Sequence, residues 1–142
     1  MGEGFTLLEL IVVIIIIGIL ATLGVTQYGR VIERMRTAEA KIIIGQIRTL
    51  QQAYYLQNDK YADDVSAGTN ELGLEGSGIP KLVCQSTHYF RYITSTRAGG
   101  YSIWADRCTS GGKSPDAATT YQIEWYYTTD NWGIWQGTPG YY

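Results

Sequence analysis

The chain has 142 residues, which is enough for one small globular domain in addition to a long apolar segment near its beginning. Its formal net charge of −2 is too small to determine a partner, but the charges are unevenly divided. Residues 30–60 carry six bases and three acids, whereas residues 61–142 carry five bases and eight acids. Because the C-terminal part is net acidic, no nucleic-acid partner is expected.

The most apolar stretch runs from Phe5 to Val25 and contains a single ionisable side chain, that of Glu9. As a helix it would be about 32 Å long, close to the thickness of a bilayer hydrocarbon core. Four consecutive isoleucines, Ile14–Ile17, would suit a buried strand, but the stretch is far too long for one. The sequence therefore predicts a helix that can cross a membrane.

Glu9 lies about one turn inside this segment. A charged group in hydrocarbon is costly, so an intramembrane glutamate is by default a candidate functional residue. The alternative is that Glu9 lies near the headgroups and only extends its carboxylate toward water.

The residues around Glu9 point to a family. The string Gly4-Phe5-Thr6-Leu7-Leu8-Glu9-Leu10, followed by an aliphatic run, resembles the N-terminus of type IV pilins and type II secretion pseudopilins. In that family a prepilin peptidase cuts after the glycine that matches Gly4, so residues 1–4 would be a leader peptide. Phe5 would become the N-methylated first residue, and Glu9 would pair with the Phe5 amine of a neighbouring subunit.

The resemblance also has two departures. The family usually carries a proline where this chain has Thr26, and Gly24 and Gly29 would weaken the helix there instead. Leaders of the family are typically basic, whereas residues 1–4 carry Glu3 and no Lys or Arg. Three arginines instead follow the apolar run, and the positive-inside rule alone would keep the C-terminal domain in the cytoplasm. We adopt the topology that the resemblance implies, with that domain outside the cytoplasm; the arginines are Arg30, Arg34 and Arg36.

An amphipathic pattern continues the helix beyond the apolar segment, and we expect one helix from Phe5 to Gln57 that stops at Asn58-Asp59. Two apolar series repeat at helical spacing, one residue out of phase, and are expected to form the stripe that a sheet covers. They are Val31, Met35, Ala38 and Ile42, and Ile43, Ile47, Leu50 and Tyr54. Polar residues are expected on the other face: Arg34, Glu39, Lys41, Gln46, Arg48 and Gln51.

After a connector rich in glycine, the remaining residues read as an antiparallel meander. The expected strands are His88–Thr94, Tyr101–Asp106, Thr119–Thr129 and Trp132–Gln136. The predicted fold is α+β and pilin-like: a long N-terminal helix packs by its C-terminal half on a small antiparallel sheet of three or four strands. The expected divisions are residues 1–4 as leader, 5–57 as helix with 5–25 as transmembrane or filament-core segment, and 58–142 as globular head.

Cys84 and Cys108 flank the first predicted hairpin, so they could meet at one end of an antiparallel pair. An even number of cysteines in a domain outside the cytoplasm favours a disulfide. Two free buried thiols are the alternative.

No catalytic set emerges from the sequence. His88 is the only histidine, and it begins a strand rather than joining a nucleophile or a metal-ligand pattern. The aspartates near residues 59–64 and on later turns match no calcium loop, so turn chemistry is preferred. We therefore expect no enzyme, no metal and no cofactor.

The twelve tyrosines and four tryptophans allow several interpretations. The preferred one is that they fill a thin core and contacts between subunits. The alternative is an exposed stacking surface for sugars or nucleic acid, formed by Tyr89, Tyr92, Trp104 and Trp135.

The predicted function is that of a structural subunit that polymerises into an extracellular pilus-like filament after leader cleavage. The resemblance implies other copies of itself as partners, together with the prepilin peptidase, the membrane before assembly and an inner-membrane assembly platform. It implies an inner-membrane precursor and then a surface filament, or a periplasmic location for a type II secretion pseudopilin. From another class, the alternative is a membrane-anchored binding module that never polymerises.

Overall fold

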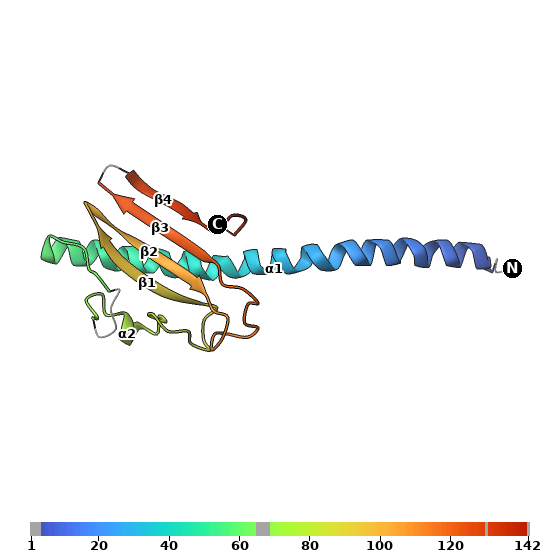
Figure 1. Ribbon diagram of the computed structural model, residues 1–142, viewed down its shortest axis with the longest axis horizontal. Helices are drawn as coiled ribbons and strands as arrows, with labels where there is room; N and C mark the ends of the chain where they lie inside the picture. Colours follow the sequence, from blue (N-terminus) through green and yellow to red (C-terminus); the bar gives the residue numbers. More distant parts are fainter. Residues whose placement is uncertain (1–3, 65–68, 130, 142) are drawn as a thin grey trace. The chain divides into compact units, whose positions relative to one another are not determined.

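The computed structural model describes residues 4–64, 69–129 and 131–141. The chain forms two compact units, residues 1–33 and 34–142. Helix α1, Leu7–Asn58, contributes to both of them (Figure 1). Each unit is described separately below.

The first unit consists of the apolar part of α1. The backbone remains helical through Thr26, which agrees with the absence of a helix-breaking proline at that position. Thr22 donates a hydrogen bond from Oγ1 to the carbonyl of Gly18, a contact that places its polar atom on the helix itself. By length and composition, α1 meets the requirement for a membrane-crossing helix.

The second unit combines residues 34–58 of α1 with one four-stranded antiparallel sheet (Figure 1). The strands follow the chain in the order β1-β2-β3-β4. They are β1, Phe90–Arg97; β2, Gly100–Arg107; β3, Gln122–Thr128; and β4, Asn131–Gly137. The α+β prediction, with a meander after the helix, is confirmed.

The tight β1–β2 connection depends on Gly99 and Gly100. Gly99 has a φ of +68°, which glycine adopts without strain. A Cβ on Gly100 would collide with the carbonyl of Tyr127 on the adjacent strand. The hairpin therefore closes beside β3 only because both positions lack a side chain.

One face of α1 forms the core with the sheet. The buried positions of the helix recur at steps of three and four, as a helix packed on a single surface requires. They are Thr37, Ala40, Ile44, Ile47 and Gln51. From the sheet, the fully buried side chains of Phe90, Tyr92, Ile103, Ala105 and Ile123 face them in the same core.

This packing corrects the predicted stripe. In the second predicted series, Ile47 is buried and Ile43, Leu50 and Tyr54 pack against the core, but the first predicted series is exposed. Val31, Met35 and Ile42 have 52%, 66% and 63% of their side chains exposed, and Ala38 is also exposed. The prediction that a sheet covers both series is wrong, because the sheet buries a single face that is centred on Ala40, Ile44 and Ile47.

Gln51 was expected on the polar face, and that prediction is wrong. Its side chain is fully buried. Its Nε2 donates to the carbonyl of Ala62 over 2.9 Å, and its Oε1 accepts from the Ala62 N–H over 3.0 Å. The buried amide thus satisfies both backbone groups of a residue in the connector, which offsets the cost of its burial.

The connector between α1 and β1 contains the short helix α2, Leu74–Ser77. Gly73 and Gly78 flank it with φ angles of +69° and +79°. Further along, Lys81 forms an isolated parallel bridge with Tyr92 of β1, so the connector lies against the first edge of the sheet.

Candidate functional site

The beginning of α1 contains a reciprocal capping arrangement between Thr6 and Glu9. The Thr6 N–H and hydroxyl donate to Glu9 Oε2 over 2.9 and 2.8 Å. The Glu9 N–H donates to Thr6 Oγ1 over 3.2 Å. This is a capping box, in which two side chains satisfy the backbone donors that a helix start leaves open. This second role of Glu9 was not predicted, although threonine followed three residues later by glutamate is the known signature of a capping box.

Gly4 and Phe5 precede the helix, and Phe5 is 91% exposed. The peptide bond between them therefore lies in non-helical backbone. Within residues 4–64, no hydrogen bond joins Glu9 to Phe5, and the Glu9 carboxylate is engaged by Thr6. The expected pairing of Glu9 with the Phe5 amine of a neighbouring subunit stays a prediction.

The side chains of the first unit form an exposed apolar surface. The large apolar residues from Phe5 to Val31 are each at least 42% exposed. Soluble monomers rarely expose apolar patches of this size, so such a surface indicates contact with a membrane or with other protein. This exposed apolar surface is the first part of the candidate functional site.

In the second unit, the predicted disulfide forms between Cys84 and Cys108, whose Cα atoms lie 5.9 Å apart. It joins the connector to the residue that follows β2. The adjacent Arg107 is only 1% exposed and donates to the carbonyls of Tyr89, Cys108 and Pro115. The disulfide and this guanidinium together organise the loop between β2 and β3.

The residues considered for catalysis or metal binding do not come together in the described part of the chain. His88 lies before β1, and its Nδ1 is 2.8 Å from the hydroxyl of Thr87. In the part of the chain that the structure describes, no three His, Cys, Asp or Glu side chains gather as a metal site would require.

The four aromatic residues considered for a stacking surface do not form one. Tyr92 is completely buried, and burial raises its pKa, with the Glu39 carboxylate adding to the effect. Trp135 packs edge-on against Trp125 with ring centroids 5.0 Å apart. Tyr89 lies among three cations, Arg36, Arg107 and Lys113, each within about 5 Å of its ring centroid. Trp104 lies apart from these, beneath the guanidinium of Arg97.

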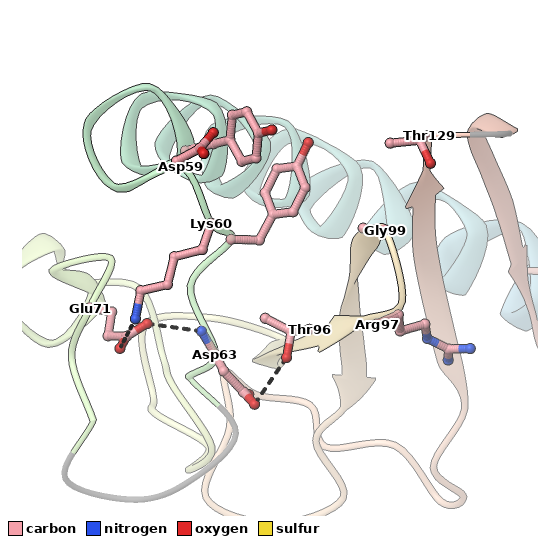
Figure 2. Close-up of a pocket in the computed structure, with 11 residues that line it drawn as sticks. Asp59, Lys60, Asp63, Glu71, Thr96, Arg97, Gly99 and Thr129 are labelled. Atoms are coloured by element: carbon pink, nitrogen blue, oxygen red, sulfur yellow. Dashed lines mark hydrogen bonds and ion pairs between the residues drawn. The ribbon is translucent and has the colours of Figure 1, made fainter.

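An unpredicted recess lies where α1 ends and the connector begins. We call it the tyrosine–aspartate recess, and its volume is about 480 Å³. Tyr55 stacks on Tyr61 with centroids 4.6 Å apart, and Tyr61 contacts Tyr101 at 4.8 Å. Figure 2 shows the charged residues around it. The lining residues used below are Tyr55, Asp59, Lys60, Tyr61, Asp63, Glu71, Thr96 and Arg97.

Hydrogen bonds fix one wall of the recess. The Asp63 N–H donates to Glu71 Oε2 over 3.1 Å, and the Thr96 hydroxyl donates to Asp63 Oδ2 over 3.3 Å (Figure 2). Burial, followed by the hydrogen bond with Tyr127, raises the pKa of Tyr61 to about 12. The phenol is therefore neutral at physiological pH, and the charge of the recess comes from its carboxylates and cations.

Comparison with known proteins finds similarity to type IV pilins. The model of the prokaryotic N-terminal methylation motif matches residues 3–25. The type IV major pilin protein PilA of Myxococcus xanthus is 36% identical over 72 residues, which are 51% of this chain and 31% of PilA. The type IV major fimbrial protein FimA of Dichelobacter nodosus is 40% identical over 86 residues, 60% of this chain and 53% of FimA. The chain carries the N-terminal methylation motif and is similar to type IV major pilins and fimbrial proteins.

A longer and weaker similarity connects this chain to the fimbrial protein of Neisseria meningitidis serogroup A. The two are 26% identical over 134 residues, 83% of this chain and 79% of the relative. By contrast, the matched part spans about a third of PilA and about half of FimA. No solved structure matches the chain.

Proposed function

We propose that this chain is a structural subunit that polymerises into an extracellular pilus-like filament. The observation that carries the proposal is the exposed apolar surface of the first unit, which coincides with the methylation motif at residues 3–25. Such a surface is stable in lipid before assembly and among the helices of other copies afterwards. The relatives named as major pilins and fimbrial proteins support a filament rather than a secretion pseudopilus.

Processing would begin at the Gly4–Phe5 bond, which lies in exposed, non-helical backbone. In this proposal a prepilin peptidase removes the residues up to Gly4, and Phe5 is then N-methylated. The precursor resides in the inner membrane, and an inner-membrane assembly platform transfers it to the growing filament. The role is structural, and catalysis by this chain forms no part of it.

Glu9 would select the register of assembly. After cleavage, Phe5 carries a positive amine, and the Phe5 amine of a neighbouring copy would meet the Glu9 carboxylate. An unpaired carboxylate among apolar helices is costly, whereas aliphatic side chains alone favour no single axial offset. The charge pair therefore provides the specificity, and the aliphatic residues provide the buried area.

The experiment is to shear filaments from cells, image them by electron microscopy and measure the intact mass of their subunit. The proposal expects filaments whose subunit begins at Phe5 and carries one added methyl group. A chain that retains residues 1–4 in the filament would contradict the processing step. Cells that express the protein in their membranes but form no filaments would contradict polymerisation and favour an anchored binding module.

A further inference from the structure

The tyrosine–aspartate recess has the character of a site for a cationic side chain. Its stacked rings, Tyr55 and Tyr61, provide negative π-faces, and Asp59 and Asp63 provide carboxylates beside them. Both the π-faces and the carboxylates attract a guanidinium or an ammonium group, and the planar guanidinium also stacks on tyrosine. Two cations of this chain also line the recess, so the question is whether they fill it.

Both of these cations already have carboxylate partners, Lys60 with Glu71 of the recess wall and Arg97 with Glu124 outside the recess. Lys60 Nζ lies 3.9 Å from Glu71 Oε1, and Figure 2 shows the ammonium directed toward that carboxylate. The guanidinium of Arg97 pairs with Glu124 at 3.0 Å and lies over the Trp104 ring. Figure 2 shows it turned away from the other labelled side chains. Among the described residues, Asp59 has no ion-pair partner.

A complementary cation exists on the same chain. Four basic side chains of α1 lie in the second unit and already contact other residues of that unit. Arg34 donates to the carbonyl of Gly140, and three others lie over aromatic rings: Arg36 over Tyr89, Lys41 over Trp135 and Arg48 over Trp125. Arg30 is exposed, and its side chain has no hydrogen bond, ion pair or ring contact within residues 4–64, 69–129 and 131–141.

We propose that the tyrosine–aspartate recess binds the Arg30 guanidinium of a second copy of this chain. The inference rests on the proposed filament and names one of its subunit contacts. Donor and acceptor occupy different surfaces of one chain, so the contact is heterologous and repeats along a fibre instead of closing a dimer. An exposed ion pair alone contributes little. Here the stacked rings add to it, and the contact recurs in every subunit.

Intermolecular crosslinking tests the contact directly. Chains that carry Arg30→Cys and chains that carry Asp59→Cys are expressed together with the unaltered chain, so that filaments form from the mixture. The matched control replaces Asp59→Cys by Asp116→Cys, an exposed acid outside the recess. We expect a disulfide-linked dimer of the two altered chains from the first pair and only a trace from the control pair.

The outcomes separate this inference from the proposed function. If filaments form but the pair at 30 and 59 gives no more dimer than the control pair, the inference is wrong and the filament stands. If the unaltered chain forms no filaments, the proposed function is wrong. A second comparison tests the charge: Arg30→Lys should preserve most filaments and Arg30→Gln should lose them. Equal yields from these two variants would overturn recognition of the cation.

Discussion

The ammonium of Lys81 lies 3.5 Å from the carboxylate of Asp64, although their side chains are only 4% and 0% exposed. Asp64 Oδ1 also accepts a hydrogen bond from the Glu71 N–H over 3.0 Å. The ion pair links the part of the connector that follows α1 to the part that lies against β1, because the Lys81 backbone forms a β-bridge with Tyr92. Two segments of the connector are thus held together by a buried ion pair.

We expect Asp64→Asn to lower the free energy of unfolding by about 3–5 kcal/mol. The asparagine can still accept from the Glu71 N–H, but the buried charge of Lys81 loses its carboxylate. Denaturant unfolding of the full chain in detergent measures the change. The double variant Asp64→Asn with Lys81→Met should recover much of the loss, since it leaves no buried charge; an equal or greater loss would show that the pair is not the cause.

The buried amide of Gln51 provides a second test. Gln51→Met keeps the volume of the side chain but leaves the N–H and carbonyl of Ala62 without their partner. Each buried group left unsatisfied costs about 1–3 kcal/mol, so a large destabilisation is expected. The exposed neighbour Gln52 supplies the control, and Gln52→Met should change the free energy of unfolding by less than about 0.5 kcal/mol. Similar effects from both variants would contradict this role.

Removing the Cys84–Cys108 disulfide should also destabilise the second unit. The bond closes a loop with a sequence separation of 24. In the chain-entropy model such a loop corresponds to about 3 kcal/mol. The Cys84→Ser, Cys108→Ser double variant should show a loss of this order in denaturant unfolding. Before reduction, thiol labelling of the native chain should find no free cysteine, and labelling of both would contradict the bond.

The raised pKa of Tyr61 predicts an alkaline transition. Burial and the hydrogen bond with Tyr127 favour the neutral phenol, with a pKa of about 12 against an unfolded value of about 10. This contribution to stability is therefore complete below about pH 10 and is lost as the pH rises toward 12. Burial also raises the pKa values of Tyr92 and Tyr101, so ultraviolet titration of tyrosinate should show one fewer late phenol in Tyr61→Phe than in the unaltered chain. A titration curve of Tyr61→Phe that equals that of the unaltered chain would show that Tyr61 is not among the late-titrating tyrosines.

The sequence predicts the long helix and the meander because their patterns are local. A run from Phe5 to Val25 fits only a helix, and alternation in residues 121–127 is typical of a strand. The buried face of α1 was harder to predict, since two apolar series fit a helix equally well. Which one is covered depends on where the sheet lies, and the local pattern does not contain this information.

The recess and the burial of Gln51 escaped prediction for a similar reason. The recess joins Tyr55 and Asp59 to Thr96 and Gly99, residues that only the folded connector and the β1–β2 turn bring together. Gln51 is buried because the connector folds back onto α1 and its residue Ala62 hydrogen-bonds the Gln51 amide. The capping role of Glu9 was accessible, because threonine followed by glutamate at this spacing indicates a capping box.

The capping box provides a way to separate two roles of Glu9. Glu9→Gln keeps an acceptor for the Thr6 N–H and hydroxyl but removes the charge that would pair with a neighbouring Phe5 amine. Thr6→Ala removes the capping hydroxyl and keeps the charge. If the charge selects the assembly register, Thr6→Ala should form nearly normal filaments and Glu9→Gln should form few.

The most direct measurement is the number and helical order of filaments on cells that express Glu9→Gln, determined by electron microscopy at equal subunit levels in the membrane. We predict that the variant is inserted and processed normally, so that its mature mass differs from that of the unaltered chain only by the substitution, while its filaments are sparse or disordered. Glu9→Gln filaments of normal number and symmetry would show that Glu9 only caps the helix, and would contradict assembly through its charge.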